Sequence, residues 1–268
     1  MSVSLEDSSL TYSNSFKIGA TYGAAQFDIT IISSNIEYSR VFSERFKGSV
    51  KLSSSMHMGD ITNTTGFSDL FITGNYQLAK SFNVAGGIKF PLSKGNIKHN
   101  DLALPMSYQT SLGTTDLILG LGYRVNNFSF YGAYQKPLIQ NDNEFLLSEY
   151  APGEISSNYR STNGFIRQDD ILFRASYTYR FNQNKFALIS SFLPIYHLGE
   201  DKYINELNQE VAIDQSAGLT FNVNLFLQIK LTKKSSLELS FGAPLKTRKA
   251  RPDGLTALSI GLEYAVLF

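Results

Sequence analysis

Long stretches of the chain alternate apolar and polar residues with a period of two. In residues 218–232, GLTFNVNLFLQIKLT, every second residue is aliphatic or aromatic, and the residues between are mostly Thr, Asn, Gln and Lys. The same alternation occurs in residues 116–125, 171–181 and 257–268. Because successive side chains of a strand point to opposite faces, each stretch predicts a β-strand with one apolar and one polar face. No segment shows a competing period of 3.6, so we expect an all-β protein.

The alternation and the turn residues between the apolar runs together predict about twelve strands. Strands of this length exceed the ~5–6 residues usual in soluble sheets and match the ~9–11 that cross a bilayer. The expected strands lie at residues 15–24, 27–42, 46–58, 67–79, 82–93, 115–126, 128–138, 170–182, 185–197, 217–232, 235–246 and 255–268.

The connections between the expected strands alternate in length. Tight turns and long loops then fall at opposite ends of the sheet, as in outer-membrane barrels. An even number of strands also returns both chain ends to the tight-turn side. We expect a short polar segment at 1–14 and one closed antiparallel up-and-down transmembrane barrel at 15–268. Its tight turns lie at 43–46, 79–82, 125–128, 182–185 and 232–235, its long external loops at 94–114, 139–169 and 198–216, and shorter ones at 59–66 and 247–254.

A soluble β-sandwich or lipocalin-like barrel is the main alternative fold. Its polar face would meet water and would be rich in Lys and Glu. Here the polar face is mostly Ser, Thr, Asn, Gln, Gly and Ala with few charges, which suits a narrow interior better than an outer surface. The apolar edge is therefore expected to face lipid and the polar edge to line a lumen. Closure follows, because unpaired backbone groups cost several kcal/mol each in hydrocarbon.

Composition narrows the compartment and the partners. The chain has 24 basic and 23 acidic residues, so a nucleic-acid partner is not expected. It contains no cysteine, which excludes disulfides and thiolate metal sites. The amino terminus, MSVSLEDSSLTYSNS, lacks a basic region and an apolar run. We expect a mature chain from which a signal peptide has been removed, in the outer membrane of a bacterium and in contact with its lipid.

The carboxyl end carries apolar residues at steps of two up to a terminal phenylalanine. This pattern resembles the signal that bacterial outer-membrane barrels present to their assembly machinery, and the resemblance implies that machinery as a partner during biogenesis. The residues of this assembly signal are Ile260, Leu262, Tyr264, Val266 and Phe268.

Three motifs carry a more specific resemblance. They are GFSDLFITGNYQL at 66–78, GGIKFPLSKGN at 86–96 and GTTDLILGLGYRV at 113–125. They resemble the bacterial outer-membrane family of the meta-pathway of phenol degradation, whose members carry G-x-x-D-L strands followed by a G-x-K-x-P partner. The resemblance covers about residues 60–125 and implies a barrel that passes small, often hydrophobic or aromatic, molecules.

Enzymes built on similar barrels need side chains that this sequence does not place together. An outer-membrane phospholipase needs a Ser-His pair facing lipid, whereas His57 lies on the lumen parity with its neighbouring serines. An omptin-type protease needs an Asp-His pair and an Asp pair at the external mouth, and His197 with Glu200 and Asp201 is the nearest candidate. An autotransporter translocator would need a helix through the pore, for which residues 1–14 are too short and polar. We expect no catalytic residue, no cofactor and no metal.

The candidate pore lining consists of charged and aromatic side chains at the alternate strand positions that are expected to face the lumen. Opposed charges across a narrow pore select solutes by charge and size, although the same residues could pair and simply fill the lumen. The candidates are Lys51, Asp69, Phe71, Lys89, Asp116, Arg124, Asp170, Arg174, Arg180, Phe226, Lys230, Glu238 and Glu263.

These patterns favour a passive channel for small molecules of unknown identity. A non-conducting barrel that serves as an accessory subunit of a larger envelope complex, with an envelope protein as its partner, is the alternative. Loops beyond ~12–15 residues are commonly functional. We expect the long loops to fold over or into the mouth, and their packing then decides whether the pore is open or plugged. The segment EFLLSEYAP at 144–152 is apolar enough to form a constriction.

Overall fold

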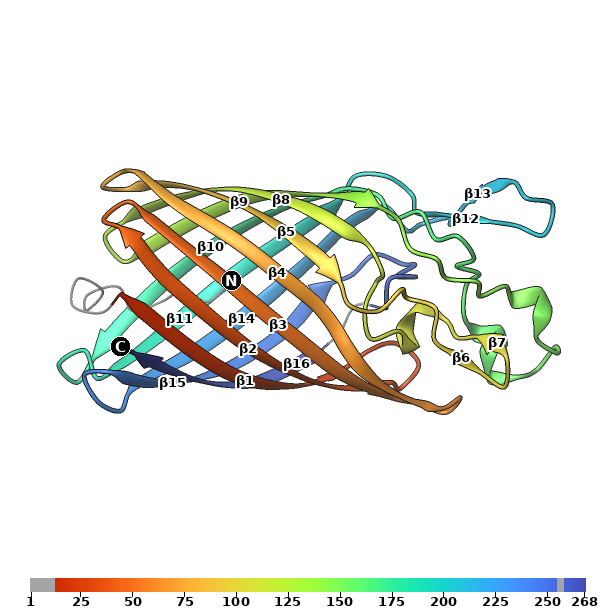
Figure 1. Ribbon diagram of the computed structural model, residues 1–268, viewed down its shortest axis with the longest axis horizontal. Helices are drawn as coiled ribbons and strands as arrows, with labels where there is room; N and C mark the ends of the chain where they lie inside the picture. The colour runs from red at the N-terminus through yellow and green to blue at the C-terminus, as the bar shows by residue number, and fades with distance from the viewer. Residues whose placement is uncertain (1–12, 255–257) are drawn as a thin grey trace.

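The computed structural model describes residues 13–254 and 258–268, and within these ranges twelve antiparallel strands close into a barrel (Figure 1). The all-β transmembrane barrel expected from the sequence is thus confirmed. The barrel strands are β1 (Asn14–Ala24), β2 (Thr30–Ser43), β3 (Phe46–Met58), β4 (Asn63–Ala79), β5 (Phe82–Pro91), β8 (Thr115–Val125), β9 (Phe128–Ile139), β10 (Asp170–Phe181), β11 (Phe186–His197), β14 (Gly218–Lys230), β15 (Ser235–Lys246) and β16 (Leu258–Leu267).

Each strand pairs with the strands that precede and follow it along the barrel, and the first pairs with the last. β1 lies antiparallel to β16, with Ser15 opposite Leu267 and Ala24 opposite Leu258. The backbone of Asn14 exchanges two hydrogen bonds of 3.0 Å with that of Phe268, which brings both ends of the barrel to the tight-turn side. Closure leaves no edge strand, as a structure surrounded by lipid requires.

The two faces of the wall separate as the alternation predicts. On β14, Leu225 is 44% exposed on the outside of the barrel, whereas Gln228 on the other face is 6% exposed. β1 repeats the pattern, with Ile18 exposed at 50% beside Lys17 at 7%. Exposure of this apolar outer surface to water would be unfavourable, whereas contact with the acyl chains of lipid is favourable.

Aromatic rings cluster on the outer surface near the tight turns. Phe82 and Tyr123 have ring centroids 4.6 Å apart, and Phe128 lies 4.9 Å from Tyr177. Such a belt is typical of the level where a membrane meets water, because these rings are apolar over most of their surface.

The other end of the barrel carries the long loops (Figure 1). They contain two short hairpins and three single turns of 3-10 helix. The alternation of apolar and polar residues did not predict these elements. These elements are β6 (Lys98–His99) with β7 (Leu102–Ala103), β12 (Lys202–Ile204) with β13 (Glu210–Ala212), and the 3-10 turns η1 (Met106–Tyr108), η2 (Leu147–Glu149) and η3 (Ile155–Asn158). Within residues 13–254 and 258–268, no helix is both long and apolar enough to cross a membrane.

The boundaries differ from expectation mainly at the loop end. β4 begins at Asn63 rather than at residue 67, and β2 begins at Thr30 rather than at 27. The barrel begins at Asn14, one residue before the expected start of the domain at residue 15, while residues 1–12 of the expected polar segment lie outside the described residues. β4 therefore extends farther towards the loop end than its apolar run suggested, because Thr64 and Thr65 still pair with His57 and Met56.

Candidate functional site

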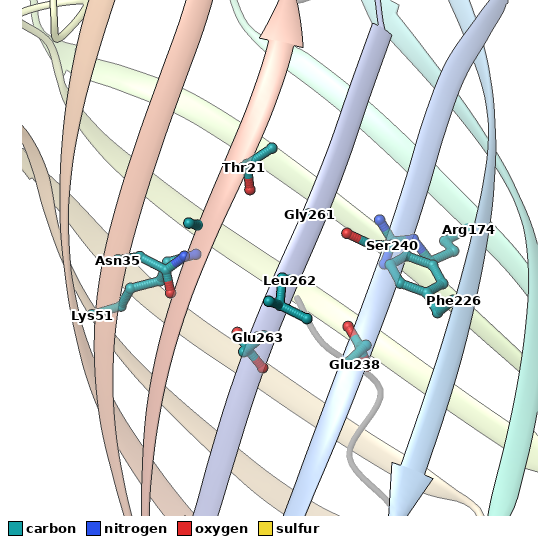
Figure 2. Close-up of a pocket in the computed structure, with 11 residues that line it drawn as sticks. Thr21, Asn35, Lys51, Arg174, Phe226, Glu238, Ser240, Gly261, Leu262 and Glu263 are labelled. Carbon is teal, nitrogen blue, oxygen red and sulfur yellow. The ribbon is translucent and has the colours of Figure 1, made fainter.

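A polar cavity of about 180 Å³ lies in the lumen, about midway along the barrel (Figure 2). Strands β1, β2 and β3 supply one part of its wall, and β10, β14, β15 and β16 supply the rest. The cavity is lined by Ala20, Thr21, Asn35, Lys51, Arg174, Phe226, Glu238, Ser240, Gly261, Leu262 and Glu263. Five of the predicted pore-lining residues meet here, namely Lys51, Arg174, Phe226, Glu238 and Glu263.

Two carboxylates lie side by side on one part of the cavity wall. Glu238 on β15 is the register partner of Glu263 on β16. Gln228 on β14 donates a hydrogen bond of 2.6 Å from its Nε2 atom to Glu238. Like charges directly opposite each other on adjacent strands destabilise a sheet, so this pair needs cations nearby.

Lys17 on β1 contacts one carboxylate of this acidic pair directly. Its Nζ atom lies 3.1 Å from Glu263 and 3.8 Å from Glu37 on β2. Sequence reasoning missed Lys17, Glu37 and the cavity-lining Asn35. All three lie at strand positions that face the lumen, like the predicted residues. They were missed because β1 and β2 show the weakest alternation, and the same rule applied to these two strands would have found them.

A second set of predicted residues lies deeper, towards the loop end. Lys89 on β5 and Asp116 on β8 form an ion pair of 2.8 Å and are 4% and 0% exposed. Thr114 accepts a further hydrogen bond of 2.9 Å from Lys89. On β4, Asp69 accepts a hydrogen bond of 2.7 Å from Ser111. These contacts tie the strands to the loop at 94–114.

Four loops pack on one another over this end of the lumen. We name residues 94–114, 140–169, 198–217 and 247–254 the loop cap. One small hydrophobic cluster takes a single buried residue from each of the four loops, namely Met106, Phe165, Ile213 and Ala250. A second cluster buries Leu104, Tyr108, Phe145 and Tyr159 of the cap against Ile31 of β2 and against Ile29, which lies just before that strand. The cap is therefore a folded element that covers the mouth.

Buried charges join the cap to the barrel rim. His197 ends β11, and its two ring nitrogens lie 2.7 Å from Asp170, which begins β10, and 2.7 Å from Asp201 of the cap. An ionised carboxylate only accepts hydrogen bonds, so the imidazole donates from both nitrogens. Arg167 forms an ion pair with Asp170, and Arg248 lies 3.8 Å from Asp201 and 2.7 Å from Asp253. We name Arg167, Asp170, His197, Asp201, Arg248 and Asp253 the rim latch.

Burial affects the ionisable groups of the cap in opposite ways. Burial opposes the charge of Arg167, but the carboxylates of Asp170 and Asp253 outweigh burial and raise the pKa of the guanidinium. At Arg251, burial dominates and lowers the pKa. Burial also raises the pKa of the Tyr159 hydroxyl. The buried guanidinium of Arg167 thus lies among carboxylates that compensate for its loss of water.

The remaining predicted residues lie outside these clusters. Phe71 on β4 pairs in register with Lys51 and Lys89, between the cavity and the cap. Arg124 and Arg180 are exposed near the tight turns, and Lys230 ends β14 on the same side. A role in lining a conducting pore stays a prediction for all thirteen residues.

Two histidines were considered for catalysis from the sequence, and the structure places His57 in the lumen and pairs His197 with Asp201 as a buried contact 2.7 Å long. His57 points into the lumen, where it lies 3.0 Å from Ser55 and donates a hydrogen bond of 2.8 Å to the carbonyl oxygen of Ser107. His197 belongs to the rim latch. Among the residues that the structure describes, no group of three His, Cys, Asp or Glu side chains could hold a metal ion.

Comparison with known proteins supports the fold. No protein-family model and no curated protein sequence matches the chain, so the resemblance to the phenol-pathway family stays a prediction. Among solved structures, the NanC porin superposes with a TM-score of 0.52 at 10% identity, covering 94% of this chain and all of that one.

Two other solved barrels superpose similarly. The translocator domain of autotransporter NalP from Neisseria meningitidis gives a TM-score of 0.52 at 8% identity, with 96% of this chain and 88% of that one covered. A FadL homologue from Pseudomonas aeruginosa gives 0.50 at 10% identity, with coverages of 96% and 90%. These likenesses show a barrel fold that proteins of different function share.

Proposed function

We propose that this protein is an outer-membrane channel for small molecules whose external mouth is closed by its own loop cap in the state described. Its apolar outer surface and closed sheet suit a bilayer, and the barrels it superposes on include a porin. The observation that carries the proposal is the polar cavity inside the lumen. A barrel that serves only as a scaffold has no need to keep a cavity lined by charged side chains at mid-depth.

The loop cap is suited to act as a gate. The chain contains no cysteine, so no disulfide fixes the cap to the wall. The rim latch holds the cap through non-covalent contacts of His197, Asp201 and Arg248. Buried charges of this kind are stable only as a complete set, because removing one partner leaves another charge buried without compensation. Breaking the latch is therefore expected to release the cap.

The cavity wall favours a small polar solute. Among its described lining residues Phe226 is aromatic, whereas Lys51, Arg174, Glu238 and Glu263 are charged. The hydrophobic or aromatic permeant implied by the family resemblance stays a prediction, to be tested on the same protein by comparing solutes.

Planar-bilayer recording tests the channel directly. We expect the wild-type protein to show rare openings and His197→Ala to open about tenfold more often, because a latch worth ~1.4 kcal/mol or more is lost. Asp201→Asn, which leaves the imidazole in place, should act in the same direction. His99→Ala removes an exposed loop histidine and serves as the matched control, with openings like those of the wild type.

A non-conducting accessory barrel is the second candidate. The close packing of the cap favours this candidate, because Phe145 and Phe165 are fully buried in it and a well-packed cap would block conduction. If wild type, His197→Ala and Asp201→Asn all fold, as circular dichroism and gel mobility would show, and none conducts, the channel proposal is wrong. An envelope protein that then co-purifies with the barrel would support the accessory role.

A further inference from the structure

We propose that the lumen cavity selects small zwitterions, solutes that carry one ammonium and one carboxylate group. This inference rests on the proposed channel function and adds a class of permeant to it. It follows from the arrangement of charge around the cavity, from an unsatisfied polar atom in its wall, and from its size.

The charges of the cavity are arranged as an acidic centre between two basic flanks (Figure 2). Glu238 and Glu263 lie on the adjacent strands β15 and β16. In the order of strands around the barrel, Arg174 on β10 lies three strands beyond β15, and Lys51 on β3 lies three strands beyond β16 on the other side. A solute in the cavity therefore meets carboxylates on one wall and a cation to either side.

Among the residues that the structure describes, the charges named around this cavity balance. Lys17 completes the set from β1, and Glu37 lies 3.8 Å from it. Three cations thus accompany three carboxylates, namely Lys17, Lys51 and Arg174 with Glu37, Glu238 and Glu263. A solute with a net charge would be attracted by one half of this set and repelled by the other. A zwitterion can face both halves, so the field across the pore orients it and favours its entry.

An amide oxygen in the wall lacks a partner. Asn35 lines the cavity, and its Oδ1 atom is buried without a hydrogen bond to any residue that the structure describes. Its side chain packs over Gly19, where an added Cβ would lie 2.9 Å from the Nδ2 atom of Asn35. A buried acceptor without a partner is unfavourable, and rotation of the amide towards the cavity would let the ammonium group of a solute satisfy it.

The size of the cavity limits the solute. The cavity volume of about 180 Å³ is well above the ~10–15 Å³ that holds a single water molecule, so a small organic solute can enter it. That space accommodates an amino acid with a short side chain. Glycine is therefore a suitable probe, and its uncharged isomer glycolamide, which has the same atoms, is the matched comparison.

The test is osmotic swelling of proteoliposomes in isosmotic glycine or glycolamide, with protein-free vesicles subtracted. Both the wild type and Asp201→Asn, with its weakened rim latch, are measured. We expect glycine to enter about fivefold faster than glycolamide, the effect of one or two partly hydrated charge contacts. Lys51→Met and Glu238→Gln should each bring the ratio of the two rates close to one. Lys233→Met, which removes an exposed charge on a tight turn, should leave the ratio unchanged.

Three results would overturn parts of this picture separately. Equal entry of the two solutes, or faster entry of glycolamide, contradicts zwitterion selection and leaves the channel intact. A glycine preference that survives both Lys51→Met and Glu238→Gln shows that selection arises elsewhere than in this cavity. No entry of either solute through wild type or Asp201→Asn contradicts the channel itself.

Discussion

At the scale of single residues, the alternation predicts which way a side chain points but not what it touches. Lys89 and Asp116 both follow the inward parity, and the structure pairs them at 2.8 Å. Their strands are adjacent in the barrel yet separated in sequence by the loop at 94–114, so only the register of β5 against β8 brings them together. Register depends on the whole sheet, and a shift by one residue would turn these side chains outward.

The buried pair gives a prediction about stability. Asp116→Ala leaves Lys89 buried without its carboxylate, and we expect the free energy of unfolding to fall by about 3 kcal/mol. Urea unfolding in lipid vesicles measures this, followed by circular dichroism because the chain has no tryptophan. The control Glu44→Ala changes an exposed turn residue and should stay within about 0.5 kcal/mol of wild type. Equal midpoints for the two variants would show that the pair contributes nothing.

At the scale of elements, the strands were predictable and the loop cap was not. Strand positions follow from a local period, which neighbouring residues reveal. The cap depends on contacts between four loops that are distant in sequence, such as Met106 with Phe165, and no local pattern reports them. For the same reason Arg167 and Arg248 of the rim latch were missed, although His197 and Asp201 were noticed as neighbours in sequence.

One glycine in the cap leads to a test of its rigidity. Gly113 has a φ of +69°, and an added Cβ would lie 2.4 Å from the carbonyl oxygen of Lys94. Gly113→Ala is therefore strained and crowded, and we expect it to loosen the loop at 94–114. Trypsin should then cut after Lys98 about tenfold faster, the effect of ~1.4 kcal/mol of lost stability. Gly132→Ala, whose Cβ would meet no atom within 4 Å, is the control and should be cut at the wild-type rate.

At the scale of the whole molecule, the fold follows from two solvents acting on one sheet. Lipid outside and a narrow polar lumen inside select opposite side chains at successive positions, which is why a period of two sufficed to predict a closed barrel. The sequence did not predict whether the lumen conducts. Conduction depends on how the cap packs and on how charged side chains meet around one cavity, namely Lys51, Arg174, Glu238 and Glu263. The assembly role expected for Phe268 stays a prediction.

The most direct test of this account is the surroundings of two neighbouring residues on β3. Val50 is 43% exposed on the outer surface, and Lys51 lines the cavity. The chain has no native cysteine, so Val50→Cys and Lys51→Cys can each carry a single spin label in lipid vesicles. We expect relaxation by dissolved oxygen to dominate at position 50 and relaxation by a water-soluble nickel chelate to dominate at position 51. The reverse result would place the polar face against lipid and contradict the account.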